Sequence, residues 1–301
     1  MTDPVIHIVA GPTASGKSGF ALTMAQRMNG VVINADSLQI YDALPILTAQ
    51  PDAVAKASVP HVLYGTLSPL AQSTAAQWAD MAVVEIEKAL AQGLTPIVTG
   101  GTGLYLKVLM DGLSDIPGVS DTVRHAARDD HAQMGSQAFY DRLKIHDAVM
   151  ANQLQPGDSQ RVIRAWEVLQ ETGKSLSYWQ SLPPIPLRPQ WRYDVTLILP
   201  PRDVLYQRCN QRFDHMLQAG ALAEVEEIAA QVSQGAIPSQ AACLKALGYR
   251  ELAAHLSGDM TWDDAGIQAK QLTRNYAKRQ VTWFTGQMRE RARTRVQVIA
   301  G

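Results

Sequence analysis

The segment 11–18, which reads GPTASGKS, constrains the fold more than any other part of this sequence. It matches the phosphate-loop pattern G-x-x-x-x-G-K-[ST] and lies between the apolar run 5–10 and a helical pattern that begins at Lys17. In such a strand, loop and helix, backbone N–H groups and the helix N-terminus surround an anion. We therefore predict a di- or triphosphate site, with Mg²⁺ on the Ser18 hydroxyl, formed by Gly11, Pro12, Thr13, Ala14, Ser15, Gly16, Lys17 and Ser18.

Short β-branched runs alternate with amphipathic stretches over the first hundred residues. The runs 31–34, 61–65 and 95–101 read as strands, and 74–92 reads as a helix that stops at Gly93. This alternation is typical of a parallel sheet covered by helices. We therefore assign the chain to the α/β class, with a P-loop-type parallel sheet flanked by helices.

The pattern changes near Pro117, after which helical periodicity replaces almost every strand signal up to a proline-rich connector. A further strand at 191–200 returns the chain to the sheet, and we expect the rest to be helical, closing with a basic helix over 266–294. The prediction is a helical insertion domain within a P-loop core. Its parts are 1–118 (first part of the core), 119–190 (the insertion) and 191–301 (second part of the core with basic C-terminal helices).

The composition is that of an ordinary globular protein: 46% of the 301 residues are apolar, 18% are charged, and the formal net charge is -1. Cys209 and Cys243 show no CxxC spacing, so we expect packing thiols rather than a disulfide or a zinc site. No apolar run is long enough to span a bilayer, and the N-terminus does not read as a signal peptide. We expect a cytoplasmic protein with no membrane partner, and a monomer.

The loop alone leaves the fate of its phosphate open. A kinase of a nucleoside or small molecule would transfer the γ-phosphoryl group of ATP, whereas an RNA-binding ATPase switch would do no chemistry on its RNA. A kinase or NTPase needs a second carboxylate on Mg²⁺, usually at the end of an apolar strand. The run 95–101 ends without one, but Asp36 follows the run 31–34, where open α/β sheets place ligand-contacting residues.

Motifs beyond the loop carry a resemblance to a known family. In order, the chain contains NADSLQIY (34–41), GGTGLYL (100–106), GDSQRVIRAWEVLQETGKS (157–175), KALGYREL (245–252) and TRNYAKRQVTWF (273–284). Together they resemble the tRNA dimethylallyltransferase family, the tRNA isopentenyl-pyrophosphate transferases, over nearly the whole chain. The resemblance implies that the loop binds dimethylallyl diphosphate and that pyrophosphate is the leaving group. The five-carbon group would go to N6 of the adenosine 3′-adjacent to the anticodon in tRNA.

The chain departs from the family pattern at a few positions. His61 is followed by Val62 where the family commonly has a second histidine, Gln50 replaces a frequent lysine, and Thr285 stands where arginine is usual. These departures concern details of RNA contact more than the reaction, because the loop and the catalytic candidates are unchanged.

The resemblance also implies roles for individual residues. Because an adenine amine is a poor nucleophile, a carboxylate that accepts its proton would help, and Asp36 is our candidate. Lys17 would stabilise the departing diphosphate, with Arg208 or Arg212 as a further clamp, of which we select Arg208. The predicted catalytic residues are Asp36, Thr102 and Lys17, and the predicted tRNA-binding residues are Asp36, Ser37, Leu38, Gln39, Thr102, Arg124, Gln160, Arg161, Val162, Ile163, Arg164, Arg274, Lys278 and Arg279.

Local structural roles explain several of these residues equally well. Asp36 suits a turn or a helix cap, and Thr102 suits an N-cap. Gln160 and Arg164 lie one turn apart, which also fits a solvated helix face. The insertion, which we expect to close over the RNA, therefore carries the less specific part of the prediction.

A basic segment near the C-terminus favours a nucleic-acid partner. Between Lys270 and Arg295 the chain has eight Lys/Arg residues and one acidic residue, Glu290, in an almost neutral protein. Aromatic residues, among them Tyr276 and Trp283, are interspersed with these cations. We interpret the segment as a contact to the RNA backbone, which predicts binding that weakens as salt rises.

Overall fold

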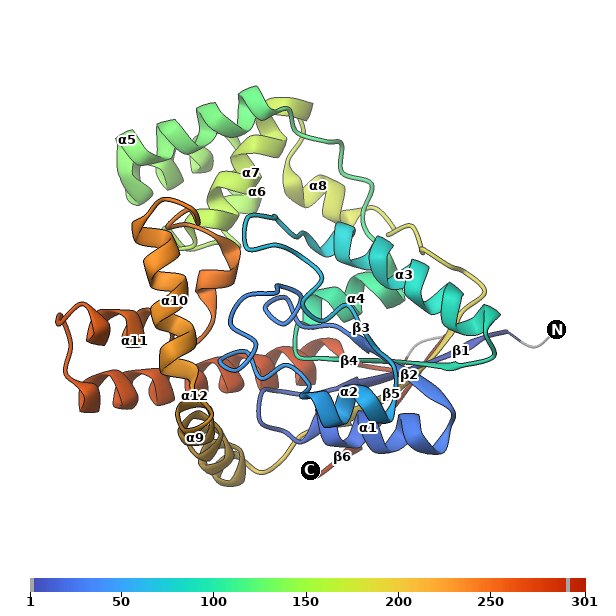
Figure 1. Ribbon diagram of the computed structural model, residues 1–301. Coiled ribbons are helices and arrows are strands. Elements are labelled where there is room, and N and C mark those ends of the chain that lie inside the picture. The colour runs from blue at the N-terminus through green and yellow to red at the C-terminus, as the bar shows by residue number, and fades with distance from the viewer. Residues whose placement is uncertain (1–2, 291–292) are drawn as a thin grey trace. The chain divides into compact units, whose positions relative to one another are not determined.

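The computed structural model describes residues 3–290 and 293–301 of the chain (Figure 1). Two compact units emerge from the contacts between residues. The core unit runs up to Met110 and resumes at Leu187, and the helical unit comprises Asp111–Pro186. The chain is therefore an α/β protein, as the sequence predicts.

The core unit is built on a six-stranded, fully parallel sheet with the strand order β3-β2-β4-β1-β5-β6. Strand β1, which precedes the phosphate loop, lies between β4 and β5. Because all strands are parallel, their carboxyl ends meet at one edge, and the loops that follow them lie side by side. The strands are β1 (Val5–Ala10), β2 (Gly30–Asn34), β3 (His61–Val62), β4 (Thr95–Gly100), β5 (Arg192–Ile198) and β6 (Thr294–Ile299).

Alternating side chains of the strands pack against helices on the two faces of the sheet. In β1, Ile6 and Ile8 belong to the large core cluster that also contains Trp78, whereas Val9 packs with Ala21 of α1 on the other face. Because both faces of the sheet are covered, the buried strands contain few polar residues. The helices of the first part of the core unit are α1 (Lys17–Arg27), α2 (Ala53–Ser58), α3 (Ala75–Ala91) and α4 (Gly103–Asp111).

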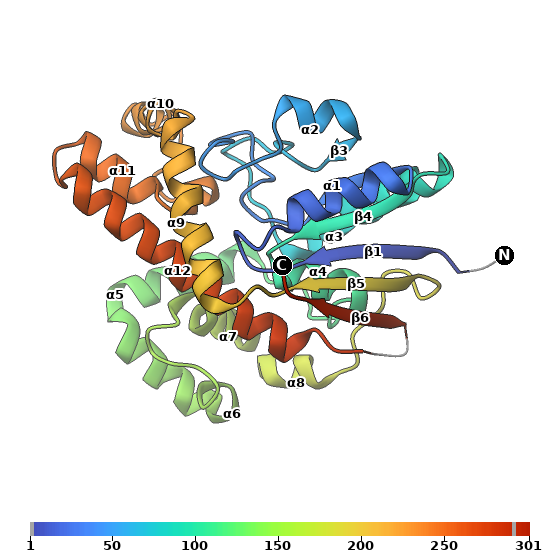
Figure 2. The same ribbon diagram turned by 90° about the horizontal axis from the view of Figure 1, so that it is seen from below.

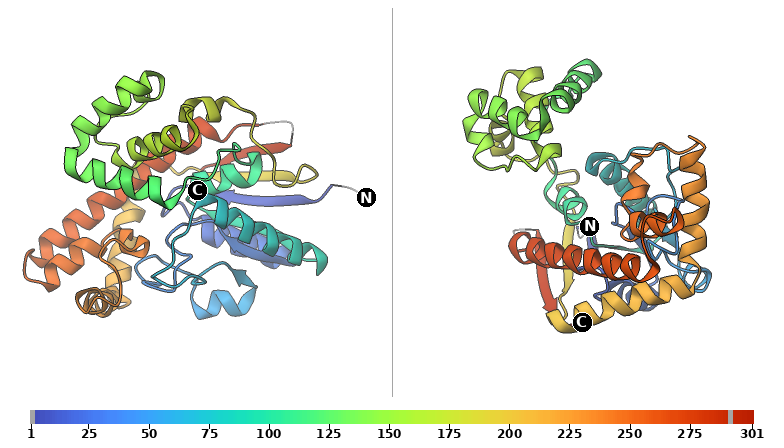
Figure 3. Two further views of the ribbon diagram at one scale, coloured as in Figure 1. Left: turned by 90° about the horizontal axis from the view of Figure 1, so that it is seen from above. Right: turned by 90° about the vertical axis from the view of Figure 1, so that its left-hand side faces the viewer.

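Helices from the second part of the core unit lie beyond the carboxyl ends of the strands, which point toward them in Figure 2. Helix α12 packs against α9 and α11 (Figure 3), so the C-terminal helices lie on the side of the sheet where the loops gather. These elements are α9 (Arg202–Gln218), α10 (Ala221–Ser233), η1 (Ala242–Lys245), α11 (Tyr249–Leu256) and α12 (Trp262–Gln287).

The structure corrects the sequence prediction at the C-terminus. The basic helix ends at Gln287 instead of continuing to Thr294, and β6 follows it at the edge of the sheet. Met288 has an extended backbone conformation, which ends the helix. Alternating β-branched residues in TRVQVI then favour a strand, and β5 offers them an unpaired edge. We did not predict this strand from the alternation in 294–299, because the basic residues directly before it read as part of a helix.

The strand predicted at 61–65 is shorter than expected. It ends at Val62, because Leu63 adopts a φ of 63° and Gly65 a φ of 58°, and both values break an extended strand. The other predicted strands lie within a residue or two of their observed positions. The predicted helix 74–92 is α3, with a capping box formed by Thr74 and Gln77, and Gly93 takes the positive φ that follows a helix end.

The helical unit has a hydrophobic core of its own, which includes Phe139, Leu143 and Trp166. Its longest helix, α5, contains a kink at Gly135, whose φ is 78°. The Arg142 guanidinium lies 4.4 Å from the centre of a Trp166 ring and pairs with Asp130. The helices of this unit are α5 (Asp121–His146), α6 (Ala148–Ala151), α7 (Ser159–Thr172) and α8 (Leu176–Ser181).

Two further expectations concern cysteines and membranes. Cys209 and Cys243 are free and buried, as expected for packing thiols. Within the described residues, every helix is too short or too polar to cross a membrane.

The end of β4 approaches the backbone after β2 so closely that Gly100 has no room for a side chain. We expect Gly100→Ala to destabilise the protein by about 1–3 kcal/mol, because the new Cβ would overlap the Ala35 carbonyl and the backbone must shift. Urea unfolding measures the loss. Gly286→Ala is the matched control, since its Cβ meets no atom within 4 Å. Equal free energies of unfolding for the two variants would contradict this close approach.

Candidate active site

Three loops lie side by side at the carboxyl edge of the sheet, and hydrogen bonds join two of them. The Ala35 N–H donates to the Thr99 carbonyl (2.7 Å), and the Thr102 N–H donates to the Ala35 carbonyl (3.2 Å). The loop after β2, which carries Asp36, is therefore fixed beside the loop after β4, which carries Thr102. The phosphate loop follows the neighbouring strand β1.

The phosphate loop has the backbone conformation that its glycines and small residues allow. Gly16, at the N-cap of α1, has a φ of 93°, and Ala14 has a φ of 61°. Lys17 begins α1, is 8% exposed and donates from Nζ to the Pro12 carbonyl (3.2 Å). Burial, followed by the positive charge of Arg212, lowers the pKa of Lys17 to about 8. Lys17 is therefore held over the loop, where a bound anion would favour its protonated form.

A cavity beside the loop combines charged groups with an apolar wall. Its polar lining includes Lys17, Asp36 and Arg212, and its apolar lining includes Leu47 and Phe213. A site of this composition suits a charged group joined to a small hydrocarbon group. The remaining lining residues are Thr13, Ser18, Leu38, Gln39, Thr48, Cys209, Met216, Leu247, Thr273 and Tyr276.

Asp36 is held in place by Asn34, a fully buried residue at the end of β2. The Asp36 N–H donates to Asn34 Oδ1 (2.9 Å), and Asn34 Nδ2 donates to the carbonyls of Asp36 and Leu63. One carboxylate oxygen of Asp36 accepts the Leu38 N–H (2.9 Å). Asp36 therefore has the turn role that we considered from the sequence, and the oxygen that accepts this hydrogen bond is Oδ1.

The negative charge of Asp36 influences several groups around the cavity. It raises the pKa values of Lys17 and Arg212, opposing the effect of their burial. The pKa values of Tyr64 and Tyr276 are raised chiefly by burial and further by this carboxylate. Asp36 therefore interacts electrostatically with both cations of the cavity, Lys17 and Arg212.

Arg212, unlike Arg208, lines the cavity that contains Asp36 and Lys17. Arg212 lines the cavity of Asp36 and also a neighbouring opening, where it meets Arg208, Gly16 and Ser18. Burial lowers the pKa of Arg212, and the nearby negative charge of Asp36 opposes this effect. From the sequence both arginines were candidates for the clamp, and we selected Arg208; they lie four residues apart on α9. The spacing could not decide between them, because only packing determines which turn of α9 faces the loop.

Thr102 and Ser37 are joined by hydrogen bonds just before the N-terminus of α4. The Ser37 N–H donates to Thr102 Oγ1 (3.0 Å), and the Thr102 hydroxyl lies 3.3 Å from Ser37 Oγ. The Thr102 carbonyl accepts the N–H of Tyr105, so the residue also begins the helix. Gln39 donates to the carbonyls of Thr48 and Ala49 and thereby supports the cavity wall.

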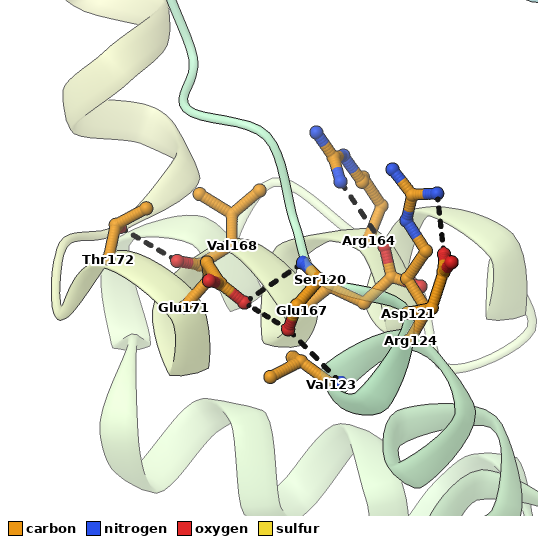
Figure 4. Close-up of polar contacts among 9 residues, drawn as sticks. All are labelled: Ser120, Asp121, Val123, Arg124, Arg164, Glu167, Val168, Glu171 and Thr172. Carbon is orange, nitrogen blue, oxygen red and sulfur yellow. Dashed lines mark hydrogen bonds and ion pairs between the residues drawn. The ribbon is translucent and has the colours of Figure 1, made fainter.

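The predicted tRNA-binding residues of the helical unit differ in their exposure and in their ion pairs. Gln160 and Arg161 are exposed on α7, whereas Val162 is 1% exposed and Ile163 packs against the core of this unit. The Val162 side chain is therefore not available to an RNA. Figure 4 shows the two remaining arginines with carboxylate partners: Arg124 pairs with Asp121 and Arg164 pairs with Glu167, each at 3.3 Å. RNA contact would require these arginines to share or exchange those partners.

The cations of α12 divide into two groups. Lys270 pairs with Asp214 (2.6 Å), and Arg274 donates to Asn210 Oδ1 (2.6 Å), so both join α12 to α9. Lys278 and Arg279 are exposed and line a surface depression with Trp283. The basic segment is therefore partly a packing element. Arg291, one of its eight cations, lies outside the described residues.

Comparison with known proteins decides which phosphate-loop family this site belongs to. The sequence model of the IPP transferase family matches residues 39–287. The chain belongs to the IPP transferase family. The match covers both units and includes Gln39 and α12, although it begins after the phosphate loop.

Relatives and solved structures extend the match to the whole chain. The "tRNA dimethylallyltransferase" of Rhodospirillum centenum is 48% identical over 287 residues, 95% of this chain and 90% of the relative. The protein of the same name from Paramagnetospirillum magneticum is 50% identical over 93% of this chain and 88% of its own. A crystal structure of a eukaryotic dimethylallyltransferase acting on tRNA superposes with a TM-score of 0.80 at 28% identity, covering 93% of this chain and 70% of that one. The Bacillus halodurans tRNA isopentenylpyrophosphate transferase gives 0.64 at 30% identity, covering 99% of this chain and 90% of that one.

The lowered pKa of Lys17 predicts proton uptake when a diphosphate binds. In the free protein Lys17 loses its proton above about pH 8, and a bound anion favours the charged form. At about pH 9, pyrophosphate binding should therefore take up a proton, and affinity should fall as pH rises through this range. Calorimetry in buffers of different ionisation enthalpy measures the uptake. Lys17→Arg, which keeps its charge, is the control, and equal uptake by both proteins would contradict the assignment.

The position of Arg212 predicts a difference between two neighbouring arginines. Arg212→Gln should weaken pyrophosphate binding about 10-fold or more, because it removes a cation from a half-buried site facing Lys17. Arg208→Gln should have a smaller effect, since Arg208 lines only the outer opening. Pyrophosphate titration of both variants tests the order, and a larger loss for Arg208→Gln would reverse it.

Proposed function

We propose that this protein transfers the dimethylallyl group of dimethylallyl diphosphate to N6 of the adenosine 3′-adjacent to the anticodon in tRNA and releases pyrophosphate. The observation that carries the proposal is that Asp36, Lys17 and Arg212 line one cavity with an apolar wall. A proton acceptor, an anion clamp and a hydrocarbon pocket are the three elements that this reaction needs. The names of the relatives support the same substrate class.

The donor would bind with its diphosphate in the phosphate loop and its hydrocarbon group against the apolar wall. Loop N–H groups, Lys17 and Arg212 would stabilise the negative charge that builds on the diphosphate as the carbon–oxygen bond breaks. Apolar residues such as Leu47 and Phe213 would exclude water from the allylic carbon. The loop would thus contribute to the chemistry as well as to binding.

The acceptor amine would reach the same carbon from the side of Asp36. As the nitrogen–carbon bond forms, N6 loses a proton, and the carboxylate oxygen that does not accept the Leu38 N–H is the proposed acceptor. Thr102, fixed to Ser37, would hold the target nucleotide near Asp36. Charge balances, because the amine proton moves to Asp36 while the diphosphate leaves with the bonding electrons.

The target base must leave its stack before the enzyme can reach N6, which costs a few kcal/mol. Contacts to the RNA backbone would offset this cost, and the exposed Lys278 and Arg279 are the best placed cations of α12. In the helical unit, Gln160 and Arg161 are the exposed candidates.

Mg²⁺ fits the site as a partner of the diphosphate. Ser18 is exposed, follows Lys17 and lines the cavity of Asp36. Among the described residues there is no cluster of three or more His, Cys, Asp or Glu that would hold a metal alone. Mg²⁺ commonly takes few protein ligands and completes its shell with phosphate oxygens and waters. When bound, the ion would neutralise charge on the leaving group, with Ser18 as its protein ligand.

The kinase alternative has weaker support from the site. Strand β4 ends in Thr99 and Gly100 without a carboxylate, and the one acidic residue that lines the cavity, Asp36, follows β2. The relatives named above are transferases that act on tRNA, which favours the transferase over both the kinase and the ATPase switch.

An assay with defined substrates tests the proposed reaction. Purified protein with Mg²⁺, unmodified tRNA and dimethylallyl diphosphate should give an adenosine heavier by one dimethylallyl group, with pyrophosphate released in equal amount and no need for ATP. Mass spectrometry of the nucleosides and a pyrophosphate assay measure both products. Unchanged tRNA, with ATP consumed when it is supplied, would support the kinase or ATPase instead.

Asp36→Asn separates proton transfer from binding. We expect turnover to fall by about 10²–10⁴-fold, because the amide cannot accept the amine proton. Pyrophosphate affinity should stay equal or increase, since a negative charge facing the anion is removed. Turnover near that of the unaltered protein would exclude Asp36 as the proton acceptor.

A further inference from the structure

One buried side chain joins the phosphate loop to the loop that carries Thr102. Gln280, on α12, is 5% exposed, and its Oε1 accepts the Thr13 N–H (2.8 Å). Its Nε2 donates to the Gly101 carbonyl (2.8 Å). The same amide group therefore holds the loop after β1 and the loop after β4, although Thr13 and Gln280 are 267 residues apart.

The surroundings leave Gln280 little freedom. A Cβ on Gly101 would overlap Gln280 Nε2, and a Cβ on Gly103 would overlap the Trp283 ring. Helix α12 therefore packs directly on the loop at the end of β4 through Gln280 and Trp283, which lie within one helical turn of each other. Exposed Lys278 and Arg279 precede Gln280 in the same helix.

We propose that Gln280 is a positioning residue that sets the spacing between the bound diphosphate and the acceptor nucleotide. The inference rests on the proposed function. Gln280 touches neither substrate; it acts through Thr13, in the loop that holds the leaving group, and through Gly101, which precedes Thr102. Gln280 also connects α12, the helix proposed to face the RNA, to the phosphate loop and to the loop that carries Thr102.

The hydrogen bond between the Thr13 N–H and Gln280 fixes the shape of the phosphate loop. Because the Thr13 N–H is committed to Gln280, it is withdrawn from the set of amides that face the diphosphate. The orientation of the Pro12–Thr13 peptide is then fixed, and with it the approach of the following N–H groups. A misplacement of about 1 Å between reacting atoms can cost about 10²-fold in rate, so a small shift of either loop would slow transfer.

A purely structural role makes a different prediction. Buried backbone groups are normally paired, and Gln280 satisfies two of them. If this were its only role, replacement would lower the melting temperature and the folded fraction but leave the turnover of each folded molecule unchanged. Kinetics normalised to folded protein distinguish the two roles.

The first experiment replaces the amide in two ways. Gln280→Met keeps the length and removes both hydrogen bonds, whereas Gln280→Glu keeps an acceptor for Thr13 but opposes a carboxylate to the Gly101 carbonyl. We expect kcat for dimethylallyl transfer, per folded molecule, to fall by about 10–10²-fold in both, with tRNA affinity changed less than about threefold because the exposed cations remain. Ser233→Ala is the control, since Ser233 is exposed and its hydroxyl donates to the Ala230 carbonyl within α10.

The second experiment is a double-mutant cycle with Gly101→Ala. The added Cβ displaces the Gln280 amide, so Gly101→Ala alone should resemble Gln280→Ala, and adding Gly101→Ala to Gln280→Ala should cost little more. Additive losses would mean that Gly101 acts without Gln280 and would overturn the proposal. So would a kcat within about twofold of the unaltered protein for Gln280→Met.

Pyrophosphate affinity separates this inference from the proposed function. Failure of the unaltered protein to modify tRNA would contradict the proposed function only. The action of Gln280 on the phosphate loop would still be tested, because Gln280→Met should weaken pyrophosphate binding about 3–10-fold. Unchanged pyrophosphate affinity together with unchanged kcat would leave Gln280 a packing residue and overturn the inference.

Discussion

The site depends on the close contact between the backbone after β2 and the end of β4. Ala35 exchanges hydrogen bonds with Thr99 and Thr102, and Gly100 makes the approach possible because it has no side chain. Parallel strands bring their carboxyl ends to one edge, but they do not by themselves bring the following loops into contact. This backbone contact fixes Asp36 and Thr102 relative to each other, and Gln280 then ties the phosphate loop to the same point.

Charge is balanced within the site in a way that suits an anionic donor. Lys17 is buried and Arg212 is half-buried, and Asp36 partly compensates their charges in the free protein. A diphosphate would add negative charge where cations, loop amides and a helix N-terminus already converge. Its departure would then be assisted by groups whose positions are fixed before the reaction. Asn34, with its buried amide, holds Asp36 without neutralising it.

Much of the fold was predictable from local patterns. The phosphate-loop octet between a strand and a helix, the helical pattern over 74–92 that stops at Gly93, and the β-branched runs each specify their own structure over short distances. Prediction was wrong at β6, because a six-residue strand after a basic helix depends on the free edge of β5. It was too long at β3, where the positive φ of Leu63 is imposed by the turn that follows.

The sequence by itself determined the α/β class, the loop and the family resemblance, since these depend on residue type, spacing and order. Only the tertiary structure decided that Arg212 lines the cavity of Asp36, that Val162 is buried, and that Arg274 is bound to α9. The bonds of Gln280 to Thr13 and Gly101 had no signal in the sequence at all. The physical reason is that helix rotation and contacts between distant segments follow from packing of the whole core, which no local pattern encodes.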